Sequence, residues 1–394
     1  MKDVVILSAA RTPIGSFLGH LSTVPATELG ATAIRAAVER AGIDVETVDQ
    51  VIMGNVLQAG QGQAPARQAA ILGGIPKKAG AITLHKVCGS GLRAVMDAAN
   101  AIKAEELELV VAGGMESMSL SPHLMENSRG GYRMGEVKVA DSMIKDGLWD
   151  PYGDTHMGNF GETCAKEYKF SREEQDAFAL QSYKRAQAAA EGGKFEDELC
   201  AVEVPQRKKD PILVDADEEP FAAPLDKMGK LRPAFDKEGT VTAANASKIS
   251  DGAAALVVTS ASSAKALGIE PLVKILGQAS FAQEPEWFTT APAHAARRAL
   301  ERAGLTVEDI DFWEIIAAFA VVTMAATKDL NLDPEKVNAR GGAVALGHPI
   351  GGSGARILTT LIHTLLQEKK RYGCAAICIG GGEACSVVIE NVTV

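Results

Sequence analysis

Residues 31–49, ATAIRAAVERAGIDVETVD, are repeated in diverged form by residues 293–311, AHAARRALERAGLTVEDID. At a constant offset of 262, eleven of the nineteen positions are identical. Both segments space their apolar residues as an amphipathic helix does. Shared helical composition alone would give scattered alanine matches rather than a block in register. The pair therefore indicates an internal duplication, and we expect a fold built from two similar halves.

Two further pairs of segments support the duplication. GSGLRAV from Gly89 matches GSGARIL from Gly352 at an offset of 263, and AGGMES at 112–117 matches IGGGEA at 379–384 at an offset of 267. Strands are expected at 3–9, 50–56, 107–113 and 253–260 in the first half, and at 271–279, 312–319, 374–380 and 385–392 in the second. Apolar strands that alternate with helices indicate sheets covered on both faces, and therefore an α/β protein.

A long insertion interrupts the first half. The strand that should close this half, by analogy with 385–392 in the second, appears only at 253–260. The insertion carries an expected helix at 171–191 and an expected irregular stretch at 204–245, and such a long insertion is typical of a lid or a binding platform. The predicted parts are a first half of 1–117 plus 249–270, an inserted loop domain of 118–248, and a second half of 271–394.

Composition limits the kinds of partner. Forty Lys and Arg against 50 Asp and Glu give a net charge of −10, which argues against a nucleic acid or an anionic membrane as partner. The chain has no apolar run of about 18 residues, as a membrane helix needs, and its start lacks the features of a signal peptide. Its six cysteines have no C-x-x-C spacing, so we expect reduced thiols and a cytoplasmic protein.

Cys88 stands at the junction of an expected strand and an expected helix, in HKVCGSGLRAV at 85–95. Backbone N–H groups at a helix N-terminus can lower the pKa of a thiol from about 8.5 toward 7. Considered alone, a cysteine in such a position is more often a small packed side chain than a nucleophile.

The second half strengthens the functional interpretation of Cys88. His348 lies just ahead of the second Gly-Ser-Gly helix, so the duplication predicts that His348 and Cys88 project toward one crevice. Cys378 ends a buried strand and is followed within two residues by glycines whose N–H groups could bind an oxyanion. Two thiols and a histidine suit acyl transfer, in which one thiol is acylated, the imidazole takes its proton and the other thiol moves protons.

The chain resembles the thiolase family over its whole length, and within it the acetyl-CoA acetyltransferases most closely. The motifs that carry the resemblance, in the family's order and spacing, are KVCGSGL (86–92), GGMESMS (113–119), HMGN (156–159), KLRPAFDKEGTVTA (230–243), GHPIGGSGAR (347–356) and CIGGG (378–382). The resemblance implies duplicated βαβαβαββ halves that form a five-layer αβαβα core, with an inserted loop domain that binds the CoA and acyl groups. It also implies a homodimer or homotetramer.

The resemblance assigns roles to individual residues. Cys88 would carry the acyl group, His348 would activate it, Cys378 would act as acid and base, and the amides of Cys88 and Gly380 would form the oxyanion hole. Residues implied to line the acyl and pantetheine tunnel are His156, Met157, Leu231, Phe235, Ala243, Ser247, Ala318 and Phe319. Without the resemblance, the two phenylalanines would be read as core residues.

The implied reaction is the reversible Claisen condensation of two acetyl-CoA molecules to acetoacetyl-CoA and CoA, or the reverse thiolysis, in fatty acid metabolism. CoA thioesters would be substrates, with no bound cofactor or metal.

One departure from the family bears on this reaction. The family writes Asn-Glu-Ala-Phe where this chain has Ile316-Ala317-Ala318-Phe319. The absent asparagine ordinarily holds a water that stabilises the enolate oxygen, and the loss of one such donor can cost on the order of 10²–10³ in rate. Two alternatives therefore stay open: a condensation-impaired acyl-CoA-binding homologue, and a 3-ketoacyl-CoA thiolase that takes longer substrates. A decarboxylating ketosynthase is disfavoured, because no second histidine occupies the region of residue 316.

Overall fold

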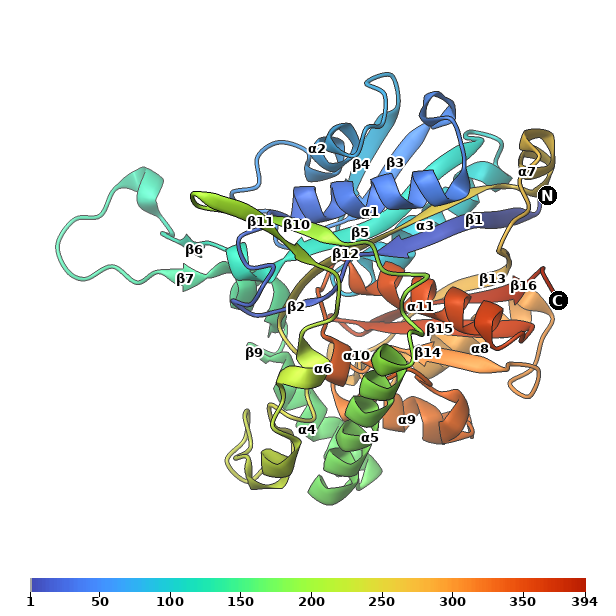
Figure 1. The fold of residues 1–394 in the computed structure, drawn as a ribbon. Coiled ribbons are helices and arrows are strands. Elements are labelled where there is room, and N and C mark those ends of the chain that lie inside the picture. The colour runs from blue at the N-terminus through green and yellow to red at the C-terminus, as the bar shows by residue number, and fades with distance from the viewer. Residues whose placement is uncertain (1) are drawn as a thin grey trace.

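The computed structural model describes residues 2–394 and contains the two expected halves (Figure 1). The first pair of repeats forms α1 (Ala26–Ala41) and α8 (Ala291–Ala303), and the second pair forms α3 (Ser90–Lys103) and α11 (Ser353–Gln367). Both α1 and α8 end in the same Ala-Gly pair, whose glycine has a φ of 64° in the first and 70° in the second. Glycine enters this left-handed region without steric cost, so the repeats share their stop signal as well as their apolar face.

The strands of both halves join in one mixed sheet. Its main strands are β1 (Val4–Arg11), β3 (Gln50–Gly54), β4 (Gly80–Leu84), β5 (Leu109–Ser117), β12 (Ser250–Ser260), β13 (Val273–Ala282), β14 (Phe312–Ile315), β15 (Tyr372–Ile379) and β16 (Glu383–Asn391). Their order is β14–β15–β16–β13–β1–β12–β5–β3–β4, and the short β2 (Gly15–Ser16) pairs with β12. The order β3–β5–β12–β1 in the first half is repeated by β14–β15–β16–β13 in the second. The halves meet where β1 and β13 pair in antiparallel fashion.

Helices cover both faces of each half-sheet. Successive side chains of a strand point to opposite faces. In β5, Val110 and Ala112 lie in the core with α3, whereas Leu109 and Val111 lie in the core with α1. The helices α3 and α11 pack together between the half-sheets, α1 and α2 (Pro65–Leu72) cover the outer face of the first half, and α8 and α9 (Ala320–Asp329) cover that of the second. These are the five layers, αβαβα, that the resemblance implies.

Two equivalent glycines let the central helices meet. A Cβ on Gly354 of α11 would lie 2.3 Å from the Leu92 nitrogen, and a Cβ on Gly91 of α3 would lie 2.8 Å from the Ala355 nitrogen. Such separations are too short for any real Cβ, so a side chain at either position would force the helices apart. The third residue of each Gly-Ser-Gly motif therefore brings together the turns that precede the two helices.

The insertion between β5 and β12 is more regular than expected. It contains β6 (His123–Leu124), β7 (Ala140–Asp141), β8 (Trp149–Asp150), β9 (Thr155–His156), α4 (Met157–Tyr168), α5 (Arg172–Glu191), β10 (Val202–Gln206), β11 (Lys209–Val214) and α6 (Glu219–Ala222). The helix expected at 171–191 is confirmed as α5, which begins with a capping box of Ser171 and Glu174. The expectation of an irregular stretch at 204–245 is wrong at its start, where β10 and β11 form a hairpin. The charged residues of this hairpin hid its short apolar alternation. The hairpin β6–β7 projects from the body of the molecule (Figure 1).

The strand expected at 312–319 is twice as long as the strand in the structure. β14 ends at Ile315, and the chain then forms a loop that leads into α9. The Asn338 side chain accepts a hydrogen bond from the Ile315 N–H and donates one to the Ile315 carbonyl, both at 2.8 Å. The Asn338 side chain thus makes the hydrogen bonds that a further strand would make at this edge of the sheet. Residues 316–319 therefore leave the sheet and turn toward the interior of the protein.

The remaining helices are α7 (Ala261–Leu267) and α10 (Ala343–Leu346). Within residues 2–394, no helix is both long and apolar enough to cross a membrane. All six cysteines are free thiols.

Candidate active site

A strained turn presents Cys88 between β4 and α3. Val87, the residue before it, has a φ of 44°, which is unfavourable for a β-branched side chain and is found mainly where the surrounding structure enforces it. The Ser90 hydroxyl enforces it here, because it donates to the Val87 carbonyl at 2.6 Å and accepts from the Lys86 N–H at 2.8 Å. The serine of the first Gly-Ser-Gly motif therefore holds the cysteine turn closed.

The thiol of Cys88 is neutral at rest. Burial raises its pKa to about 12, while a hydrogen bond from the Gly380 backbone N–H acts in the opposite direction. The expectation that the helix N-terminus lowers this pKa is wrong, because loss of hydration outweighs the amide dipoles. Cys88 consequently needs a base to become a nucleophile.

His348 has the tautomer of a base. It lies in the turn between α10 and α11, where its Nδ1 is 2.5 Å from the Ser353 Oγ. The Ser353 hydroxyl donates its hydrogen to the Pro349 carbonyl at 2.8 Å, so this oxygen accepts from Nδ1–H and leaves Nε2 unprotonated. Burial lowers the pKa of His348 to about 3, aided by the charge of Arg356. Among residues 2–394, Nε2 has no hydrogen-bond partner, so it is free to take a proton.

Cys378 is the last residue but one of β15 and is fully buried. Burial raises its pKa well above the ordinary value, and the neighbouring Cys88 raises it further. Ile379, the residue after Cys378, packs closely against the turn that carries Cys88. A Cβ on Gly89 would lie only 2.3 Å from the Ile379 Cδ1. The turn that carries Cys88 therefore rests on the end of the strand that carries Cys378 and Gly380.

A cavity of about 470 Å³ lies beside His348. Five of the predicted residues line it, namely His156, Phe235, Ala243, Ser247 and Phe319, together with His348. Cys88 packs on the same small apolar cluster as Leu148, Ile249 and Ile350, which also line the cavity. Cys88 therefore packs against wall residues of the cavity that His348 borders.

The other predicted residues lie around this cavity in different ways. Met157 begins α4 beside the turn at Gly380, with its Cε 3.5 Å from where a Cβ on Gly380 would be. The Ala318 carbonyl accepts the Ser247 N–H at 2.8 Å and so supports the cavity wall from behind. Leu231 is 38% exposed and is not among the residues that line the cavity. The two phenylalanines and His156 form an aromatic group, with ring centroids 4.7 Å apart for His156–Phe235 and 6.0 Å apart for Phe235–Phe319.

The loop at 316–319 brings an apolar side chain to the centre. Ile316 is fully buried in the same core cluster as Cys378, Phe319 and Met157. Ala317 is fully buried on the other side of the loop, among residues of α5 and α10. Neither side chain can hold a water or donate a hydrogen bond, so the structure offers no replacement at these two positions for the polar groups that the family uses.

The structure also assigns a role to a carboxylate that the sequence did not single out. Glu116 is completely buried and accepts hydrogen bonds from the Asn55 side chain and from the N–H groups of Val56, Leu57 and Gly351, at 2.8–3.1 Å. Burial raises its pKa to about 7. It ties the first half to the turn that follows His348 in the second.

The duplication could have revealed this carboxylate. Glu383 aligns with Glu116 in the third pair of segments, and its carboxylate lies 2.5 Å from the Lys86 ammonium in the turn before Cys88. In each half a glutamate therefore reaches the turn before the other half's central helix, with Glu116 near the end of β5 and Glu383 at the start of β16. The aligned serines Ser90 and Ser353 act within their own halves, where each donates to a carbonyl of the turn that precedes its helix.

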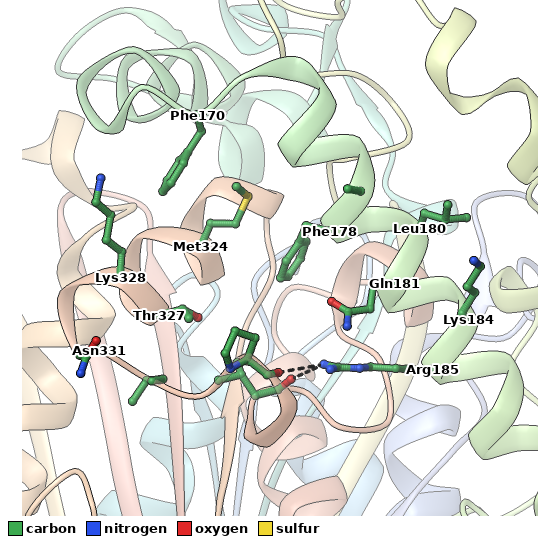
Figure 2. A pocket seen from close by; sticks show the side chains of 14 residues that line it. Phe170, Phe178, Leu180, Gln181, Lys184, Arg185, Met324, Thr327, Lys328 and Asn331 are labelled. Atoms are coloured by element: carbon green, nitrogen blue, oxygen red, sulfur yellow. Dashed lines mark hydrogen bonds between the residues drawn. The ribbon is translucent and has the colours of Figure 1, made fainter.

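A larger cavity of about 790 Å³ lies elsewhere, between α5 and α9 (Figure 2). Arg185 bridges its base by donating to the carbonyls of Pro334 and Val337, and Phe178 and Met324 project into it. None of the predicted site residues lines this cavity. Within the described part of the chain, no group of three or more His, Cys, Asp or Glu side chains is arranged to hold a metal ion.

The fold is a two-half α/β architecture, and its candidate site contains Cys88, His348 and Cys378. Comparison with known proteins identifies the family. Residues 4–262 match the thiolase N-terminal domain and residues 269–391 match the thiolase C-terminal domain. The chain therefore belongs to the thiolase family.

Known relatives extend over the full length. The chain is 53% identical to the acetyl-CoA acetyltransferase of Cupriavidus necator over 99% of this chain and 100% of the relative. It is 51% identical to acetyl-CoA acetyltransferase 2 of Arabidopsis thaliana over 99% and 97% of the two chains. Among solved structures, the Acat5 thiolase of Ascaris suum in complex with coenzyme A is 43% identical, with a TM-score of 0.95 and coverage of 99% and 100%. The acetyl-CoA acetyltransferase of Bacillus anthracis is 40% identical, with a TM-score of 0.97 and coverage of 100% and 99%.

Proposed function

We propose that this chain is an acetyl-CoA C-acetyltransferase that forms acetoacetyl-CoA and CoA from two acetyl-CoA molecules, or cleaves acetoacetyl-CoA in reverse. The observation that carries the proposal is the His348 imidazole, whose Nδ1 is fixed by Ser353 and whose Nε2 is left free on a cavity with wall residues that pack against Cys88. The full-length relatives named acetyl-CoA acetyltransferase support the choice of substrate.

The first half-reaction is acyl transfer. The Cys88 sulfur attacks the thioester carbonyl of acetyl-CoA as its proton passes to His348 Nε2, and CoA leaves with a proton from the same imidazole. The pKa of Cys88 is about 12 and that of His348 about 3, so the proton moves only as the sulfur–carbon bond forms. The N–H groups of Cys88 and Gly380 would receive the oxyanion, a role that the Gly380 bond to the thiol supports.

The second half-reaction forms the carbon–carbon bond. Cys378 first passes its thiol proton to the free Nε2 of His348, and the resulting thiolate removes a proton from the methyl group of a second acetyl-CoA. The enolate carbon then attacks the acetyl group on Cys88, and the released Cys88 sulfur takes the proton from His348. The enolate oxygen needs a donor, and Ile316 supplies none. We therefore propose that acyl transfer is efficient in this chain and that condensation is the slow half. The chemistry calls for no bound cofactor, because CoA arrives and departs as part of the substrates.

Short acyl groups fit the proposal better than long ones. Phe288 packs against Phe319 and Phe160, with ring centroids 6.4 and 6.3 Å apart, and all three side chains are at least nine-tenths buried. These rings fill the space behind the cavity. A 3-ketoacyl-CoA thiolase with longer substrates would need this space for the acyl chain.

We also propose self-association as a homodimer or homotetramer. β4 is the edge strand of the large sheet and leaves Ile82 48% exposed. The projecting β6–β7 hairpin exposes Met134 completely. An open sheet edge and an apolar hairpin tip are both suited to contact another copy. A cytoplasmic location and a role in fatty acid metabolism complete the proposal, on the strength of the acyl-CoA chemistry alone.

Isotope exchange separates the two halves of the reaction. Exchange of labelled CoA into acetyl-CoA requires only acyl transfer, whereas acetoacetyl-CoA formation and cleavage require both steps. We expect rapid exchange with slow condensation in the unaltered chain, and loss of exchange in Cys88→Ser. Equal exchange and condensation rates would show that Ile316 does not limit the enzyme. Absence of exchange would refute acyl transfer and leave an acyl-CoA-binding protein.

A further inference from the structure

A partly buried lysine ties together the loop that lines the substrate cavity. Lys248 lies on the cavity wall with Ala243, Ala246 and Ser247. Its ammonium donates to the Ala243 carbonyl and, at 3.3 Å, to the Ala246 carbonyl. The end of the segment 242–248 is thus fastened back to its beginning by a charged group.

No counterion explains this charge. Tyr183 presents its ring to the ammonium at 5.7 Å. Glu219 is the one carboxylate with an effect on the pKa of Lys248, but it makes no ion pair with it within residues 2–394. Its oxygens instead accept from Tyr183 at 3.3 Å and from Ser16 at 2.8 Å. Burial lowers the pKa of Lys248 to about 8, so the ammonium is still largely protonated at pH 7.

The backbone around Lys248 joins the cavity wall to the catalytic histidine. The Lys248 carbonyl accepts the His348 N–H at 3.0 Å. One residue earlier, the Ser247 N–H donates to Ala318 at 2.8 Å. A movement of this segment would therefore change both the wall that faces the substrate and the support of His348.

We propose that the Lys248 ammonium is an internal cation that positions the segment 242–248 to bind the pantetheine arm of the CoA substrate. The inference rests on the proposed function for the identity of the substrate. Lys248 is a positioning residue, because its contacts are carbonyls of the protein and the face of Tyr183.

The test compares Lys248→Met, which keeps the apolar stem, with Lys265→Met, which removes an exposed lysine of α7. We expect Lys248→Met to weaken CoA binding about ten-fold by calorimetry, which corresponds to about 1.4 kcal/mol, and to raise the KM for acetyl-CoA by the same factor. A much smaller change is expected in kcat. S-acetylpantetheine, which lacks the nucleotide phosphates, should show the same loss. A loss confined to acetyl-CoA would overturn the proposal, because it would mean that Lys248 pairs with a phosphate.

Chemical rescue separates a missing charge from a general defect. In Lys248→Ala, ammonium chloride should restore CoA affinity and sodium chloride of equal concentration should not, whereas Lys265→Met should respond to neither salt. Unchanged affinity in Lys248→Met, or identical effects of the two salts, would overturn the proposal. If the unaltered chain fails to bind CoA, the proposed function is wrong. Hydrogen exchange of residues 242–248 then tests the positioning role by itself. The exchange should be faster in Lys248→Met than in the unaltered chain if Lys248 positions the segment, and equal if it does not.

Discussion

Replacing Ile316 with asparagine should restore carbon–carbon bond formation. Ile316 is fully buried in the cluster that contains Cys378, and Nε2 of His348, the base proposed above, has no hydrogen-bond partner within residues 2–394. An amide at position 316 would supply a donor, or hold a water, at the enolate oxygen. One donor of this kind contributes on the order of 10²–10³ in rate. We therefore expect condensation to rise by about this factor while CoA exchange changes little.

The same substitution should lower stability. It removes a branched apolar side chain from a closed core and buries an amide, and a buried polar group without a full set of partners costs about 1–3 kcal/mol. Ile316→Leu is the matched control, because it changes shape without adding a polar group, and it should leave the ratio of condensation to exchange unaltered.

The assay measures both rates on the same preparations, with thermal unfolding recorded in parallel. A folded Ile316→Asn variant in which condensation stays as slow as in the unaltered chain would refute the reasoning, since it would show that the missing donor is not what limits the reaction. An equal rise in Ile316→Leu would refute it as well, because packing rather than polarity would then be the cause.

Three further results are expected. Gly89→Ala should destabilise the chain by about 1–3 kcal/mol through overpacking, because the new Cβ would meet Ile379 at 2.3 Å. It should also reduce the rate of CoA exchange. Adding Ile379→Ala should recover part of that rate, and an additive loss would argue against the contact. Ser353→Ala should lower kcat about ten-fold with KM unchanged, because it removes the hydrogen bond to His348, which contributes about 1.4 kcal/mol. A change in KM alone would contradict the conclusion that Ser353 fixes the tautomer of His348. The buried neutral His348, with a pKa near 3, binds fewer protons than its unfolded form below pH 6.5. Stability should therefore fall by up to about 1.4 kcal/mol per pH unit as the pH drops below 6.5, and denaturant titrations of His348→Asn should show a shallower fall.

Most of the fold could be predicted from the internal repeats. Matching segments in register predicted that α1 would be equivalent to α8 and α3 to α11, and the structure confirms both pairs. The pairing of β1 with β13, which joins the halves, has no local signal, because it depends on two strand edges far apart in the chain. The end of β14 was missed for a similar reason. It is set by Asn338, a side chain 23 residues further along the chain.

The candidate reactive groups are visible in the sequence, whereas the groups that support them are not. Cys88, His348 and Cys378 stand beside glycine turns that the sequence displays. The protonation of His348 depends instead on the direction in which one hydroxyl points, that of Ser353. The pKa of Cys88 depends on burial by distant segments, so the helix N-terminus alone gave the wrong direction. Lys248 shows the same limit, since only the folded loop reveals which carbonyls receive its ammonium.

Intact-protein mass spectrometry after brief mixing with acetyl-CoA tests whether Cys88 carries the acyl group. We expect that the unaltered chain and Cys378→Ser gain the mass of one acetyl group, that peptide mapping locates it on Cys88, and that Cys88→Ala gains nothing. We also expect slower acetylation in His348→Asn. An acetyl group that persists in Cys88→Ala, or no acetylation of the unaltered chain, would contradict the assignment of Cys88 as the acyl carrier.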